Sequence, residues 1–221
     1  MPVKSPPPPS ILPAFSLVLA IVALAGFVDA YSFVQFQKLF VSFMSGNTTS
    51  LGVAAAHLDR DKLHQLPLVL SLFVGGVVLG SLVHRWAGRR AAPVLLGVVA
   101  ALLGLAYRFP ALAVWGLTLG MGMLNASVHE VGEHKVSLTF VTGALVKFGA
   151  GLANLLSGQP QSGEWLWQAS LWLAFVAGAF AGSLALLHLP HHALLLAAGL
   201  SLGLAGAASL VHGLRQGPPA A

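Results

Sequence analysis

The ten residues FMSGNTTSLG, at positions 43–52, bring amide, hydroxyl and glycine residues together inside a chain that is otherwise strongly apolar. Of its 221 residues, 57% are hydrophobic and 8% are charged, and the mean hydropathy is +0.84. These values are typical of integral membrane proteins and exclude an ordinary water-soluble domain. The polar stretch must therefore be explained as part of a membrane protein.

Apolar segments of about 20 residues, the length that spans a lipid bilayer as a helix, recur along the chain. Two more apolar segments, at 39–57 and 136–157, are interrupted by polar and small residues. Little of the chain is left for a soluble domain, so we expect helices and their short connections to carry the function. The uninterrupted segments lie at 14–34, 66–83, 91–107, 109–128, 165–187 and 191–212.

The formal net charge of +5 comes from basic residues beside one predicted helix end and at the two termini. The positive-inside rule produces this distribution, so we expect the lipid bilayer, and no nucleic acid, as a partner. The chain has no cysteine, which excludes disulfides and thiolate metal sites. The basic residues in question are Lys4, Arg85, Arg89, Arg90 and Arg215.

The second half of the chain resembles the first when it is displaced by about 100 residues. FVGGVVLGSL at 73–82 matches FVAGAFAGSL at 175–184 at six of ten positions. FMSGNTTSLG aligns with FVTGALVKFG at 140–149, and Asp29 aligns with Asn125. The pattern predicts an internal duplication.

We expect an all-α integral membrane protein whose two repeats each contain a helix, an interrupted polar segment and two further helices. If the interrupted segments enter and return without crossing, the chain crosses about six times and the halves are inverted. If they cross, there are eight crossings and the halves are parallel. The charges favour six crossings with both termini cytoplasmic, although the connection at 159–164 then lies inside without Lys or Arg. The predicted divisions are a Pro-rich leader at 1–12, repeats at 13–108 and 109–213, and a tail at 214–221.

Glycine pairs at helical spacing predict close helix packing. Packing within the monomer is favoured, and a homo-oligomer formed through these faces is the alternative. The pairs lie in GVVLG at 76–80, GLTLG at 116–120, GAFAG at 178–182 and GLSLG at 199–203.

The interrupted segments predict a site, because irregular backbone at membrane depth survives only against protein or a water-filled cavity. In transporters, matched interruptions in two halves point to the substrate site. We expect Gly46 to permit the break, and the polar residues to line a pathway for a small polar solute or ion. The alternative is that the hydroxyls only satisfy their own helix. The predicted pathway residues are Asp29, Ser45, Gly46, Asn47, Thr48, Thr49, Asn125, Thr142, Gly143 and Lys147.

Asp29 and Lys147 are ionisable residues in apolar segments, and such residues pair, face a cavity or mark a function. One interpretation pairs them across the two halves. The other has Lys147 extending to the membrane interface and Asp29 ending its helix near water.

HEVGEH at 129–134 imitates the HExxH zinc signature, but its second histidine comes one residue too late. His129 and His134 would therefore face different sides of a helix and could not share a zinc ion. No catalytic pair can be argued from spacing. The sequence predicts no metal, no cofactor and no enzyme activity.

Four stretches resemble the YoaK family of bacterial membrane proteins, over nearly the whole chain after the leader. They are AGFVDAYSF at 25–33, LFVSFMSGNTTSLG at 39–52, GMLNASV at 122–128 and TFVTGALVKFG at 139–149. The resemblance implies a multi-pass protein of the bacterial inner membrane with about six helices, and it implies no substrate. The fourth stretch lacks the Asn-Thr-Thr triplet of the second, so the two half-sites are chemically unequal.

Two functions fit these observations. The first is a small-solute secondary transporter or permease with a polar site at the repeat interface. The alternative is a structural or accessory inner-membrane protein without transport activity, in which polar residues only hold helices together. A solvated cavity beside Asn47 and Thr142 would favour the first.

Overall fold

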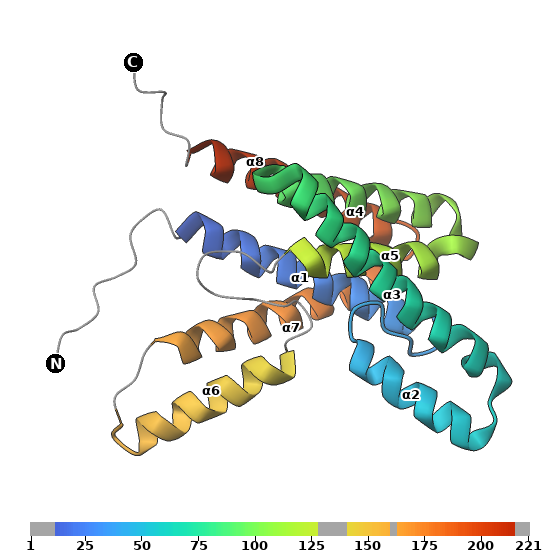
Figure 1. Ribbon diagram of the computed structural model, residues 1–221, viewed down its shortest axis with the longest axis horizontal. Helices are drawn as coiled ribbons and strands as arrows, with labels where there is room; N and C mark the ends of the chain where they lie inside the picture. The colour runs from blue at the N-terminus through green and yellow to red at the C-terminus, as the bar shows by residue number, and fades with distance from the viewer. Residues whose placement is uncertain (1–11, 128–140, 160–162, 215–221) are drawn as a thin grey trace.

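The computed structural model describes residues 12–127, 141–159 and 163–214, and these residues form eight α-helices and no strand. The leader, the HEVGEH stretch and most of the tail lie outside the described residues. The helices (Figure 1) are α1 (Leu12–Gln35), α2 (Met44–His57), α3 (Arg60–Ala87), α4 (Ala91–Arg108), α5 (Ala113–Ser127), α6 (Val141–Leu156), α7 (Glu164–His188) and α8 (Ala193–Leu214).

Five of the described helices, α1, α3, α4, α7 and α8, are long and apolar enough to cross a membrane. Helix α5 has 15 residues and lies in the bundle between α3 and α4, which both pack against it. The predicted all-α integral membrane fold is confirmed.

Helices from opposite halves of the chain form the closest pairs, α1 with α7 and α3 with α5. In the first pair, Ala23 lies against Gly178 and Phe27 against Gly182, so the two helices run parallel. A Cβ added at either glycine would overlap a backbone oxygen of α1. Glycine is required here because the two backbones touch.

The pair α3 and α5 repeats this geometry. Gly76 lies against Leu119 and Gly80 against Met123, again in parallel order. Gly122 of α5 in turn approaches the backbone of Phe73. The GxxxG patterns of α3 and α7 therefore pack inside the monomer, as predicted.

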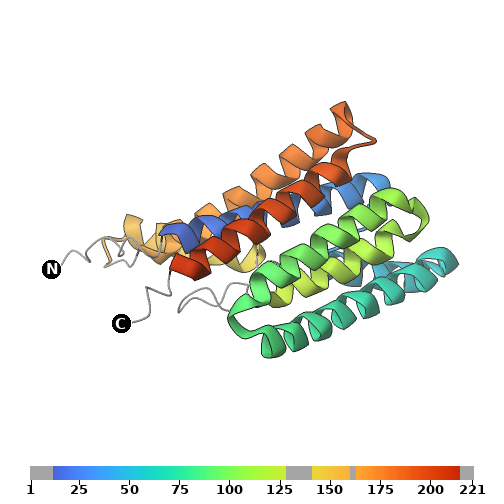
Figure 2. The same cartoon turned by 90° about the horizontal axis from the view of Figure 1, so that it is seen from above.

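Helix directions give an inverted arrangement. Figure 2 shows that α1 and α5 run in opposite directions, as do α3 and α7, and α4 and α8. Helix α1 begins and α8 ends at the same end of the bundle. Two inverted repeats with six crossings would have this geometry, while the duplication itself stays a prediction from the sequence.

Helices α2 and α6 are half-length elements at the margins of the bundle. They have 14 and 16 residues, fewer than the roughly 20 that span a bilayer, and unlike the similarly short α5, which packs between α3 and α4, each packs mainly against one helix. Helix α2 packs against α3 and α6 against α7, and Figure 1 shows them at opposite ends of the molecule. The break that was expected at Gly46 lies instead in residues 36–43, and Gly46 belongs to the first turn of α2. A Cβ at Gly46 would lie 2.7 Å from the Phe43 ring, so a larger residue there would require this ring to shift.

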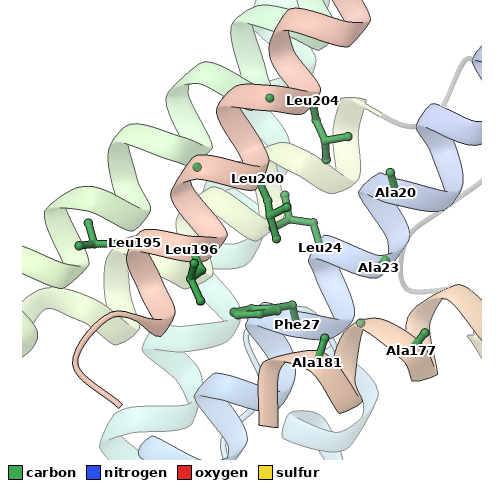
Figure 3. Close-up of a pocket in the computed structure, with 13 residues that line it drawn as sticks. Ala20, Ala23, Leu24, Phe27, Ala177, Ala181, Leu195, Leu196, Leu200 and Leu204 are labelled. Atoms are coloured by element: carbon green, nitrogen blue, oxygen red, sulfur yellow. The ribbon is translucent and has the colours of Figure 1, made fainter. Parts of the chain in front are cut away.

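The two other GxxxG patterns differ from each other. Gly120 of α5 lies close to Leu102 of α4, whereas Gly199 and Gly203 of α8 have no neighbour that an added Cβ would meet within 4 Å. They border an apolar groove of about 700 Å³ between α1, α7 and α8 (Figure 3). Helix α4 thus packs closely against α5, whereas a groove separates α8 from α7.

Two matched glycine substitutions test the helix contacts. Gly178→Ala should destabilise the protein by about 1–3 kcal/mol, because the methyl group collides with the backbone of α1. Gly199→Ala adds the same methyl group beside open space and should leave stability unchanged or slightly raised, since alanine favours helix. The melting temperature and the yield of each variant in detergent measure its stability. Equal losses in the two variants would contradict the packing.

Cysteine labelling tests the helix directions, because the natural chain has no cysteine. Single cysteines at Asp61, after α2, and Gly163, before α7, should react with an impermeant maleimide from opposite faces of the membrane. The link after α2 and the link after α6 lie at opposite ends of the molecule (Figure 1). If both cysteines react from the same face, the inverted arrangement is wrong.

Candidate functional site

The chain reverses directly after α1. Gln37 and Lys38 adopt positive φ angles of 52° and 67°, a conformation that residues other than glycine rarely take. The Lys38 N–H donates to the Phe33 carbonyl at 3.0 Å, and the Phe36 N–H donates to the Ser32 carbonyl at 2.8 Å. These bonds end the helix and turn the chain back along it.

Asp29 on α1 binds the returning chain. Its Oδ1 accepts the N–H groups of Val41 at 2.9 Å and Ser42 at 2.8 Å, and its Oδ2 accepts the Ser42 hydroxyl at 2.5 Å. Asp29 is 3% exposed. Because Asp29 lies more than one helical turn before the end of α1, residues 36–43 enter the protein and α2 leaves it again. We call residues 36–43 the re-entrant segment.

Two more side chains hold the re-entrant segment. The Ser32 hydroxyl donates to the Leu39 carbonyl at 2.8 Å. The Asn47 amide donates to the Phe40 carbonyl at 2.7 Å and accepts the Phe40 N–H at 3.2 Å. The irregular backbone therefore has the hydrogen-bond partners that membrane depth requires. We call Asp29, Ser32, Ser42 and Asn47 the polar cluster.

The structure thus separates the predicted residues of α2. Asn47 is buried in the polar cluster. Thr48 and Thr49 are exposed and donate their hydroxyls to Met44 and Ser45 of their own helix, as the structural alternative expected. Ser45 is also exposed.

The predicted residues of the second half lie apart from the polar cluster. Asn125 is buried on α5 and donates to the Met121 carbonyl at 3.0 Å. On α6, Thr142 and Lys147 are exposed and Gly143 is half-buried. The structure does not bring Asp29 and Lys147 together, since both carboxylate oxygens of Asp29 bind Val41 and Ser42. Nor does Asp29 end its helix near water, because it is buried within α1.

Sequence reasoning missed Ser32 and Ser42. Ser32 follows Asp29 by three residues and so shares its helix face, which was a usable signal. Ser42 lies in the apolar run before the quoted polar stretch, and nothing in the sequence marked it as the partner of Asp29. Among the described residues, no group of three His, Cys, Asp or Glu side chains could hold a metal ion.

The apolar groove between α1, α7 and α8 is separate from the polar cluster. Its walls are alanine, glycine, leucine and phenylalanine side chains, including Ala23, Phe27, Ala177 and Leu200 (Figure 3). None of the predicted pathway residues lines it.

These features define a multi-pass helical membrane protein with a buried carboxylate that fastens a re-entrant segment. The chain belongs to the family described as "Protein of unknown function (DUF1275)", whose profile matches residues 17–207. It is 35% identical over 168 residues to the "UPF0700 transmembrane protein RA0705" of Rhizobium meliloti (strain 1021), covering 76% of this chain and 74% of that protein. No solved structure matches. The expected relationship to an uncharacterised family of bacterial integral membrane proteins is confirmed.

A matched pair of substitutions in α2 tests the polar cluster. Asn47→Ala leaves the N–H and C=O of Phe40 without their side-chain partner and should lower stability by about 1–3 kcal/mol. Thr48→Val removes a hydroxyl that bonds only to its own helix, so its effect should stay within about 0.5 kcal/mol. Detergent melting curves measure the difference. If Thr48→Val were the more harmful change, the exposed face of α2 would matter more than the cluster.

Proposed function

We propose that this protein is a secondary transporter or permease for a small polar solute in the bacterial inner membrane. The observation that carries the proposal is the re-entrant segment bound to the buried carboxylate of Asp29. In transporters with inverted halves, substrate and ion sites lie where irregular backbone meets half-length helices.

The ionisable side chain of Asp29 supports a function beyond folding. A carboxylate within a membrane-spanning helix is unfavourable, and such residues usually face a pathway or take part in proton relays. A neutral amide oxygen could also accept hydrogen bonds from backbone N–H groups, although more weakly, so folding alone does not require a carboxylate. The sequence alignment places such an amide, Asn125, at the corresponding position of the other half.

The exposed face of α2 also supports a polar pathway. This half-length helix has four exposed hydroxyl side chains within about one turn of the polar cluster, those of Ser45, Thr48, Thr49 and Ser50. Polar side chains at membrane depth favour contact with water or protein over contact with lipid. A solute that moves along α2 would pass directly over the re-entrant segment.

The alternative function is a structural or accessory membrane protein. It is favoured by the hydrogen bonds of Asn47, Thr48 and Thr49, all of which are made to nearby backbone atoms or side chains of this chain. A catalytic role has less support, because Asp29 is the one carboxylate of the described long helices that lies away from a helix end, Asp61 and Glu164 being in first turns.

Solute flux into vesicles tests the proposal. Purified protein in liposomes should accelerate the swelling or uptake of at least one probe from a panel of glycerol, urea, amino acids, pentoses and short organic acids. Gly199→Ala, which lies away from the polar cluster, should keep that flux, and Asp29→Asn should remove it. If no probe enters faster than in empty liposomes while the protein is folded, the accessory function is the better account.

A further inference from the structure

The two carboxylate oxygens of Asp29 have different kinds of partner. Oδ1 accepts two backbone N–H groups, which can only donate. Oδ2 accepts the hydroxyl of Ser42 at 2.5 Å. A hydroxyl can both donate and accept, so it can reverse its role without moving its oxygen atom. Oδ2 can therefore bind a proton while every partner of the carboxylate stays in place.

A metal cation does not suit this environment. The N–H groups of Val41 and Ser42 point at Oδ1, so a cation could bind only at Oδ2, which already accepts the Ser42 hydroxyl. Hard cations require several oxygen ligands, and among the described residues no group of three His, Cys, Asp or Glu side chains could hold a metal ion. The arrangement thus favours a proton over a metal ion.

Proton binding at Oδ2 would weaken the hold on the re-entrant segment. Hydrogen bonds to an ionised carboxylate are about twice as strong as bonds to a neutral acceptor. Neutral Asp29 would keep its geometry but bind the N–H groups of Val41 and Ser42 less tightly. The segment would then depend on Ser32, which holds Leu39, and Asn47, which holds Phe40.

We propose that Asp29 and Ser42 form a proton-binding site, and that loading it loosens the re-entrant segment. The role of this site in coupling transport to a proton gradient rests on the proposed function. If the protein is a transporter, proton movement would drive opening of the re-entrant segment beside α2. When Oδ2 carries the proton, its O–H group donates to Oγ of Ser42. Ser42 therefore stays bound to Asp29, but it accepts the hydrogen bond that it donated before.

The other titratable groups on the elements around this site lie mostly near helix ends. The described ones are Tyr31 on α1, Lys38 in the re-entrant segment, His57 at the far end of α2, and Glu164 and His188 at the two ends of α7. Helix α3, which packs against α2, carries Arg60, Asp61, Lys62 and His64 near its start and His84 and Arg85 near its end. Helix α5 contributes none, and α8 contributes none among its described side chains. The hydrogen bonds of the Asp29 carboxylate involve none of these groups.

Hydrogen exchange measures the hold on the segment directly. In full-length protein in lipid nanodiscs, the protection factors of the Val41 and Ser42 amides should fall by about tenfold from mildly alkaline to mildly acidic solution. That factor corresponds to weakening one charge-assisted hydrogen bond. Protection factors are already corrected for the pH dependence of chemical exchange, so a remaining change reports structure.

Two variants separate Asp29 from the rest of the cluster. Asp29→Asn resembles the neutral form and should show low protection at every pH. Asn47→Ala should lower the protection of Phe40 at every pH but keep the pH dependence at Val41 and Ser42, because Asp29 is intact. Constant protection in the natural protein, or the same pH dependence in Asp29→Asn, would overturn the proposal.

Infrared spectroscopy detects the proton without altering Asp29. The chain has three aspartates, and Asp59→Asn with Asp61→Asn leaves Asp29 as the only one. With carbon-13 labelled aspartate, acidification should produce a shifted carboxylic acid band that reports Asp29 alone, even if Asp29→Asn fails to fold. A carboxylate signal that never converts across the stable pH range would refute proton binding.

These measurements need no solute, so they separate the two proposals. A proton-loaded Asp29 in a protein that passes none of the vesicle probes would uphold the proton site and reject transport. Solute flux without a proton-loaded Asp29 would uphold transport and reject the proton site.

Discussion

The structure depends on one interaction, the binding of the Asp29 carboxylate to the N–H groups of Val41 and Ser42. Within a membrane, backbone that is neither helix nor barrel needs partners for its polar groups, because lipid supplies none. Asp29 supplies them for the deepest part of the re-entrant segment, and Ser32 and Asn47 supply them for its neighbours. With these bonds in place, α2 can begin inside the protein and run outward along α3.

Close contacts between the two halves provide the frame around this segment. Helices α1 and α7 touch through Gly178 and Gly182, and α3 and α5 touch through Gly76, Gly80 and Gly122. Because lipid tails are as apolar as leucine, such contacts are stabilised by close packing more than by the hydrophobic effect. The frame is uneven, since α4 lies close to α5 while α8 leaves an apolar groove beside α1 and α7.

Much of the fold could be predicted from the sequence. Hydrophobic length identified the long helices, and the glycine spacing in GVVLG and GAFAG identified two helix contacts. The site was predicted less well. Asp29 and Asn47 both lie in the first half of the chain and belong to one polar cluster. Thr48 and Thr49 bond only to their own helix, and Lys147 lies on α6, away from the cluster. Closeness in the sequence predicts one site for neighbouring polar residues, but a helix directs neighbouring side chains to different faces.

The sequence by itself determined the membrane environment and the approximate positions of the spanning helices, and it marked Asp29 as a carboxylate within an apolar segment. These follow from composition and from local spacing, which act within a single helix. Only the tertiary structure decided which groups satisfy Asp29 and which glycines are buried. The partners of Asp29 depend on a chain reversal at Gln37 and Lys38, two residues with no local preference for positive φ. The burial of Gly178 but not Gly199 depends on how closely a neighbouring helix approaches, and the packing of the whole bundle sets that distance.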